Sequence, residues 1–345
     1  MPLVSFLMSN YKTPPAYLKR ALDSMLAQTM TDFEAVIIND GVKDASYGIL
    51  LEYAAKDNRI RLIENETNLG LAASLNKGIE QCRGKYIARM DTDDICYPER
   101  LQLQTEYMDA NPDIMFSGAW ADVFDDDENE IKYQWQPVMC QHEEYRIRLL
   151  FSNEPCLLHP TVFFRSDFLR NQNLLYSENQ LYRYTEDYEM WTSCADSGCA
   201  GILEKPVIKY RNAEKENRIT VRHAKEMERC SFNTQKKLFS RLNIDLTEEI
   251  YLLNLRMLSG RKPYDTRYKK WMNKILRRNK QYRIYDQKIM KKLFHERWYN
   301  IVYYDIAHRK GITNRLTHAF TMYPSEYLRF LKDMLERRKR KRHGK

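Results

Sequence analysis

The sequence lacks the features that mark several large classes of protein. No apolar run approaches 18 residues, so no membrane-spanning helix is expected. The seven cysteines are scattered, odd in number and include no C-x-x-C pair. This usage argues for free thiols in a reducing cytoplasm and against a disulfide scaffold or a zinc site. Neither the P-loop pattern G-x-x-x-x-G-K-[ST] nor the dinucleotide fingerprint G-x-G-x-x-G occurs.

The start of the chain also lacks a basic region followed by a long apolar one. "MPLVSFLMSNYKTPP" is therefore expected to form a first strand and not a signal peptide. Charged residues are unevenly distributed along the chain. Residues 251–345 hold 27 Lys and Arg against 7 Asp and Glu, a net charge of +20, whereas residues 1–250 hold 29 against 40, a net charge of −11. Opposite balances suggest regions with two different tasks.

Short apolar runs and amphipathic stretches alternate over the first third of the chain. We expect strands over 3–9, 33–40, 60–64, 85–91 and 114–124, and helices over 15–28, 47–57, 71–82 and 98–110. Strands that are apolar on both faces indicate a mostly parallel α/β sheet flanked by helices. We divide the chain into a main domain, 1–220, with halves 1–124 and 125–220, and a basic, mainly α-helical region, 221–345.

Polar residues cluster where the predicted strands end. In an open parallel sheet, ligands bind beyond the carboxyl ends of the strands, so these clusters should be neighbours in space. Asn39 and Asp40 follow the second strand, and a polar turn at Asn68 precedes the third helix. An amide and a carboxylate there could contact a base or a ribose, although a plain strand-to-helix turn would use the same residues.

Three carboxylates follow the fourth strand in "ARMDTDDICYPERL". Asp91 and Asp93, on either side of Thr92, have a spacing that lets two carboxylates reach one ion. Mg²⁺ and Mn²⁺ prefer such hard oxygen ligands, together with phosphate oxygens and water. The alternative is a solvated acidic turn in which Asp94 caps the next helix. The position at the end of a parallel strand favours the metal.

Two later motifs supply further candidates. "TEDYEMW" places Glu186 and Asp187 at the start of a helix that carries Trp191 one turn later. A carboxylate beside apolar walls suits general-base work, but an acidic residue there also balances a helix dipole. His159, in "LLHP", is either a substrate contact or a structural histidine.

The C-terminal stretch "YPSEYLRFLKDMLERRKRKR" combines an amphipathic pattern with a basic run at 337–342. Such a segment can lie on an anionic membrane surface. A solvated basic helix end is the alternative, and nucleic acid is an unlikely partner.

Taken together, the motifs resemble the family 2 glycosyltransferases, which are inverting enzymes with a GT-A fold. The resemblance covers residues 2–212 and is most specific over 65–104, where "NLGLAASLNKGIEQCRGKYIARMDTDDICYPERLQLQ" matches the central family motif. "LHPTVFFR" and "YTEDYEMW" occur in the family's order. The chain looks most like bacterial members that build O-antigen or capsular polysaccharide.

The resemblance implies a role for each candidate. The nucleotide-sugar-binding positions are Tyr11, Asn39, Asp40, Asn68, Asp91 and Thr92, the metal ligands are Asp91 and Asp93, and the acceptor-side positions are His159, Glu186 and Trp191. Asp187 falls on the family's base. The cofactor would be Mg²⁺ or Mn²⁺, the donor a UDP-sugar, and the acceptor a saccharide, such as a lipid-linked oligosaccharide at the inner membrane face. The chain departs from the family pattern at Ser9, in place of proline, and at Ala213, in place of a histidine.

Two other functions share some of these sequence features. A sugar-nucleotide pyrophosphorylase shares the carboxylates and the α/β pattern but usually needs a glycine-rich phosphate loop, and "SFLMSNYKTPP" contains no glycine. A non-enzymatic protein that binds phosphate or nucleic acid would explain the basic C-terminus. It would leave unexplained why carboxylates end several strands, since they repel phosphate.

Overall fold

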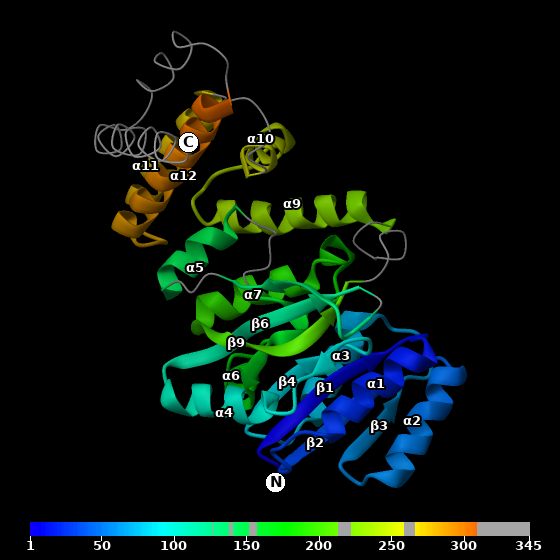
Figure 1. Ribbon diagram of the computed structural model, residues 1–345. Coiled ribbons are helices and arrows are strands. Elements are labelled where there is room, and N and C mark those ends of the chain that lie inside the picture. Colours follow the sequence, from blue (N-terminus) through cyan, green and yellow to red (C-terminus); the bar gives the residue numbers. More distant parts are fainter. Residues whose placement is uncertain (126, 138–140, 152–156, 213–221, 259–265, 309–345) are drawn as a thin grey trace, which may run out of the picture. The chain divides into compact units, whose positions relative to one another are not determined.

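The structure is a computed structural model that describes residues 1–125, 127–137, 141–151, 157–212, 222–258 and 266–308 (Figure 1). The strands are β1 Val4–Asn10, β2 Phe33–Asn39, β3 Ile60–Glu64, β4 Tyr86–Met90, β5 Ile95–Cys96, β6 Ile114–Phe124, β7 Ile131–Trp135, β8 Phe163–Arg165 and β9 Cys199–Arg211. The helices are α1 Pro15–Leu26, α2 Ala45–Lys56, α3 Leu71–Gln81, α4 Arg100–Ala110, α5 His142–Leu149, α6 Ser166–Asn171, α7 Glu186–Ser197, α9 Ala224–Ser240, α10 Glu248–Leu258, α11 Thr266–Tyr282 and α12 Gln287–His308. Short 3₁₀ helices cover His159–Thr161 and Gln180–Tyr182.

The chain forms two compact units. The first combines Met1–Arg146 with Asn153–Thr234, and the second combines Ile147–Ser152 with the chain from Gln235 onward. The first unit contains the whole sheet, in the order β3-β2-β1-β4-β8-β6-β9-β5, with β7 paired to β6. The division into functional domains near residue 220 stays a prediction.

The first four strands are parallel, as their apolar sequences predict. β1 lies between β2 and β4, and β3 pairs with the outer edge of β2. All residues of β2 and β4 are buried, because helices cover both faces of the sheet. The carboxyl ends of these strands therefore meet along one edge.

Side-chain alternation along β1 shows which helices cover which face. Phe6 belongs to a core cluster that also contains Leu22 of α1, Leu50 of α2 and Leu101 of α4. Leu7 points to the other face, where a Cβ on Gly78 of α3 would come within 2.2 Å of its Cδ1 atom. α3 thus packs closely on β1 and β2, while α1 and α2 lie side by side on the opposite face (Figure 1).

The other half of the sheet is mixed. β8 pairs antiparallel with both β4 and β6, β6 pairs parallel with β9, and β5 and β7 are antiparallel additions. The prediction of an α/β sheet flanked by helices is confirmed, and parallel pairing is found within β1–β4 and between β6 and β9. β9 is the longest strand, at 13 residues, and its C-terminal end pairs with β5 immediately after the Asp91–Asp94 segment.

The second unit is helical, as the sequence predicts for the C-terminal region. Trp271 of α11 and Trp298 of α12 are both buried within it. Phe151 contacts Phe294 edge to face, with ring centroids 5.2 Å apart. No helix in the described ranges is both long and apolar enough to cross a membrane. The basic run at 337–342 lies outside the described residues.

Candidate active site

The ends of β1 and β2 are joined by buried side-chain hydrogen bonds. The Asn10 amide donates to the Asn39 Oδ1 atom at 3.0 Å and to the Ser46 hydroxyl at 2.9 Å. The Asn39 amide donates in turn to the backbone carbonyl of Val42 at 2.7 Å. Asn39 therefore has a clear structural task in the turn before α2. Its nucleotide-binding role stays a prediction.

Asp40 holds the turn that leads into α3. Its carboxylate accepts hydrogen bonds from the Asn65 amide at 2.9 Å and from the backbone N–H groups of Leu69 and Gly70, at 2.8 and 2.9 Å. Gly41 next to it has φ +74°, and a Cβ there would lie 2.1 Å from the carbonyl carbon of Thr67. The two turns are thus packed backbone against backbone, and only glycine fits at this contact.

The D-x-D segment follows β4 and carries Asp91, Thr92 and Asp93 into the same edge. Asp91 forms an ion pair with Arg89 of β4. The Thr13 hydroxyl, in the loop between β1 and α1, donates to the Thr92 hydroxyl at 2.8 Å. The segment is therefore fixed on one side by its own strand and on the other by the loop after β1.

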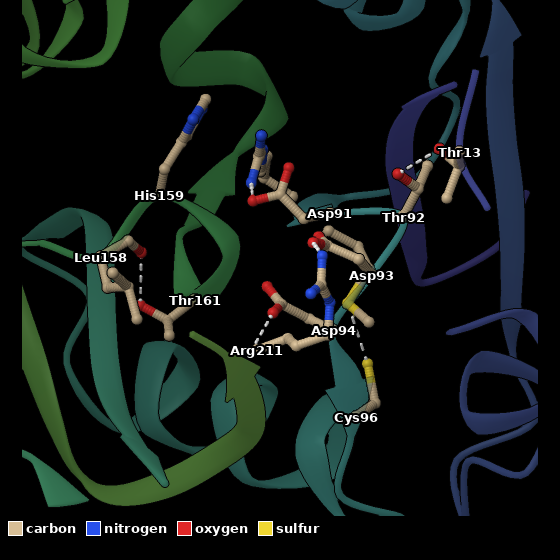
Figure 2. A network of polar contacts seen from close by, with 12 residues as sticks. Thr13, Asp91, Thr92, Asp93, Asp94, Cys96, Leu158, His159, Thr161 and Arg211 are labelled. Atoms are coloured by element: carbon tan, nitrogen blue, oxygen red, sulfur yellow. Dashed lines mark hydrogen bonds and ion pairs between the residues drawn. The ribbon is translucent and has the colours of Figure 1, made fainter. Parts of the chain in front are cut away.

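Arg211, at the end of β9, binds the remaining two carboxylates (Figure 2). Its guanidinium pairs with Asp93 and its backbone N–H donates to the Asp94 Oδ1 atom at 2.8 Å. The Asp94 Oδ2 atom is buried without a hydrogen-bond partner among the described residues. Burial, reinforced by repulsion from Asp93 and Asp91, raises the pKa of Asp94 well above its usual range. Asp94 thus favours the protonated form.

The pKa of Asp93 is also raised, first by burial and then by the charge of Asp91, although Arg211 opposes both effects. Figure 2 shows Asp91, Asp93 and Asp94 following one another along this segment, with Arg211 approaching from β9. Three carboxyl groups therefore share one small volume, and their mutual repulsion is relieved by guanidinium groups.

The N-terminus of α7 brings two more carboxyl groups. Asp187 accepts a hydrogen bond from the backbone N–H of Tyr188 at 2.7 Å. Burial raises the pKa of Asp187, while the nearby Arg89 lowers it. Burial, and then the charge of Asp187, raise the pKa of Glu186 to about 7. Because Asp187 also senses the charge of Asp91, the structure places this pair near the D-x-D segment.

His159 lies beside the same group of charges. Its Nε2 atom is 2.9 Å from the Tyr176 hydroxyl, and burial together with the positive charge of Arg89 lowers the pKa of His159 well below its ordinary value. The neutral imidazole packs edge to face on Trp191, with ring centroids 5.7 Å apart. Trp191 is 0 % exposed. Any effect of Trp191 on an acceptor would therefore act through His159.

The structure brings together most of the residues singled out from the sequence. Asp91, Asp93, Glu186, Asp187 and His159 surround the end of β4. Tyr11 is 46 % exposed and Asn68 is also exposed, so both are open to solvent. Ala213 lies outside the described residues.

Sequence reasoning missed both arginines. Arg89 was hidden in a strand, although a charge inside the apolar run "YIARM" was a usable signal. Arg211 is 118 residues from Asp93, and nothing in the local sequence connects the two.

The fit of a divalent cation can be judged from the donors. Asp91 and Asp93 have side chains about one-third exposed, at 34 % and 33 %, and each pairs with a guanidinium through one oxygen. The described part of the chain holds no group of three or more His, Cys, Asp or Glu side chains able to bind a metal alone. One or two carboxylates suit Mg²⁺ or Mn²⁺ when phosphate oxygens and water complete the shell. The donor set fits a cation shared with a diphosphate.

Comparison with solved structures shows the fold. The chain is similar to TarS 1–349 of S. aureus, with a TM-score of 0.53 and 17% sequence identity over 91% of this chain and 89% of that one. It is similar to the complex of the same protein with UDP-GlcNAc, with a TM-score of 0.55 and 16% identity over 91% and 90% of the two chains. The predicted GT-A class is therefore confirmed at the level of fold.

Sequence comparison shows the family. The model of "Glycosyl transferase family 2" matches residues 5–171. The chain is 38% identical over 218 residues to an uncharacterized glycosyltransferase of Methanocaldococcus jannaschii, which covers 63% of this chain and 73% of the relative. It is 33% identical over 192 residues to the amylovoran biosynthesis glycosyltransferase AmsE of Erwinia amylovora, which covers 55% and 68%. The chain is a transferase that belongs to glycosyl transferase family 2.

Proposed function

We propose that this transferase moves a hexose or N-acetylhexosamine from a UDP-sugar to a hydroxyl of a saccharide acceptor, with inversion at the anomeric carbon. The observation that carries the proposal is that Asp91 and Asp93 directly follow β4 and that Asp187, at the start of α7, lies within range of the charge of Asp91. The complexes of TarS with UDP and with UDP-GlcNAc support a uridine nucleotide, because the fold is shared.

The donor would lie across the ends of the parallel strands. Tyr11, Asn39, Asp40 and Asn68 border the nucleoside end, and Asp91 with Thr92 borders the ribose and diphosphate. Asp93 and Asp91 would hold Mg²⁺ or Mn²⁺. When bound, that cation supplies Lewis-acid stabilisation of the charge that develops on the leaving diphosphate.

Asp187 is the proposed base. Its carboxylate would accept the proton of the acceptor hydroxyl as that oxygen attacks the anomeric carbon from the side opposite the diphosphate. The C–O bond to the acceptor forms while the bond to the diphosphate breaks, so a single displacement inverts the configuration. Burial raises the pKa of Asp187 and so makes it a stronger proton acceptor. His159 and Glu186 would contact the acceptor.

The acceptor would be a lipid-linked oligosaccharide of a cell-surface polysaccharide, presented at the inner face of the cell membrane. Amylovoran biosynthesis, named for the AmsE relative, supports a polysaccharide pathway. The basic C-terminal region supports a location at an anionic surface, since each Lys or Arg near such a surface contributes about 1 kcal/mol.

The base assignment is tested by Asp187→Asn. The amide cannot take the proton, so turnover should fall about 10²–10⁴-fold while the Kd for UDP stays nearly unchanged. Release of UDP from a panel of UDP-sugars measures turnover, and NMR of the product's anomeric proton establishes inversion. Asp196→Asn is a matched control, because Asp196 lies on the same helix but pairs with Arg146, 3.6 Å away. Full activity in Asp187→Asn, or retention of configuration, would contradict the mechanism.

A further inference from the structure

A charged side chain occupies the middle of the sheet. Arg89 is 2 % exposed and belongs to β4, whose residues are all buried. It lies beside Leu7 of β1 in the parallel register, and its backbone N–H donates to the carbonyl of Val162 at 3.0 Å. A buried ion costs several kcal/mol unless other charges and hydrogen bonds compensate. The position therefore needs a reason beyond packing.

The guanidinium of Arg89 pairs with one carboxylate of the site, and its charge reaches two others. Its Nη1 atom forms the ion pair with Asp91, and its buried Nε atom has no hydrogen-bond partner among the residues that the structure describes. Burial is the largest single influence and disfavours the charged guanidinium, but the charge and hydrogen bond of Asp91, together with Tyr176 and Asp94, raise the pKa of Arg89 overall. The same positive charge also acts on Asp187 and Glu186 at the start of α7, where it lowers the pKa of both groups against the effect of burial.

The two neighbouring arginines are used differently. Arg100 of α4, which is fully buried, directs its guanidinium to the Arg89 carbonyl at 2.7 Å and the Gln104 side chain at 3.0 Å, so it serves neutral groups of the framework. The guanidinium of Arg211 pairs with Asp93, and the backbone N–H of Arg211 donates to the carboxylate of Asp94. Arg89 is thus the arginine that is paired with Asp91 and whose charge also acts on Glu186 and Asp187.

We propose that Arg89 is a positioning residue for the transfer reaction, which holds Asp91 in place for the donor and supplies the positive charge that faces Asp187. This inference rests on the proposed function. Three charged groups act on Asp187: Arg89 and Asp91, which belong to or follow β4, and Glu186, its neighbour on α7. The Tyr176 phenol also lies within range of Asp187. Arg89 is the cation in this set, and without it the carboxylates would face one another alone.

Arg89→Gln and Arg89→Lys separate the two proposed roles of Arg89, holding Asp91 in place and supplying a positive charge near Asp187. The glutamine removes the charge, so the Kd for UDP should rise about tenfold as Asp91 loses its anchor. The acid limb of the pH profile of kcat should move up by about one pH unit, because an opposite charge no longer favours the ionised base. Lysine keeps the positive charge but lacks the planar guanidinium group. The acid limb of the kcat profile of Arg89→Lys should therefore stay in place, while its binding of UDP weakens.

Arg165→Gln is the control for a purely structural loss. Arg165 of β8 donates to the backbone carbonyls of Ile114 and Met108, at 2.8 and 2.7 Å, away from the site carboxylates. Thermal unfolding of all variants measures loss of structure, and Arg165→Gln should lower Tm without moving the acid limb. An unchanged acid limb and unchanged UDP binding in Arg89→Gln would overturn the inference, as would the same shifts in Arg165→Gln. If the wild-type protein neither binds nucleotides nor releases them from sugar donors, the proposed function fails and this inference fails with it.

Discussion

Glu186→Gln should stabilise the protein above neutral pH and leave it unchanged in acid. Burial and the adjacent Asp187 raise the pKa of Glu186 from 4.5 to about 7 in the folded state. Between these pH values the unfolded chain has released the proton while the folded chain still holds it. The free energy of unfolding therefore falls as the pH rises from 4.5 to about 7, and remains lower above that range.

The size of the effect follows from the shift. Each pKa unit corresponds to about 1.4 kcal/mol, so a displacement from 4.5 to about 7 gives an upper value of roughly 3–4 kcal/mol at pH 8. Glutamine resembles the protonated acid in shape and charge, and so it avoids this loss.

Thermal unfolding of wild type and Glu186→Gln at pH 5 and pH 8, followed by circular dichroism, measures the effect. We expect Tm to rise by several degrees at pH 8 and by little at pH 5. Asp196→Asn, on the same helix, should show no such dependence. Equal stabilisation at both pH values would mean that packing is responsible, and no gain at pH 8 would refute the argument from burial. Lower turnover in the stabilised variant is expected, since active sites trade stability for function.

Two further predictions concern the turn and the C-terminus. Gly41→Ala should lower the free energy of unfolding by roughly 1–3 kcal/mol, because φ is +74° and the new Cβ would clash with the backbone of Thr67. Gly48→Ala is the control: a Cβ there meets no atom within 4 Å, so the change should be neutral or stabilising. Thermal unfolding of the two variants measures the difference. Deletion of 325–345 should weaken sedimentation with phosphatidylserine vesicles but not with neutral ones. Unchanged binding by the truncated protein would remove the proposed anchor.

The alternating strands and helices of the first half were predictable, because the spacing of the apolar residues and the positions of the turn residues indicate the same boundaries. β3 and β6 begin and end at the predicted residues, 60–64 and 114–124. β8 escaped prediction because three residues carry too little pattern. β9 was not predicted because its 13 residues include Glu204, Lys205 and Lys209, which interrupt the apolar run typical of a buried strand.

The site was predictable where it depends on strand ends and unpredictable where it depends on tertiary pairing. Asp91 and Asp93 follow an apolar strand, and parallel strands bring their carboxyl ends together. The pairing of Asp93 with Arg211 joins residues 118 positions apart, and only the β9–β5 contact brings them together. Asp40 was read as a nucleotide contact, and its hydrogen bonds to the turn before α3 appear only in the folded chain.

The most direct test of the account is calorimetric titration of UDP into wild type and Asp93→Ala, with and without Mn²⁺. The account predicts binding that Mn²⁺ strengthens in wild type, and loss of that strengthening in the variant, because Asp93 would hold the cation against the diphosphate. GDP and dTDP serve as alternative nucleotides. Mn²⁺-dependent binding that survives in Asp93→Ala, or no binding of any of these nucleotides by the wild type, would contradict a donor site at the ends of the parallel strands.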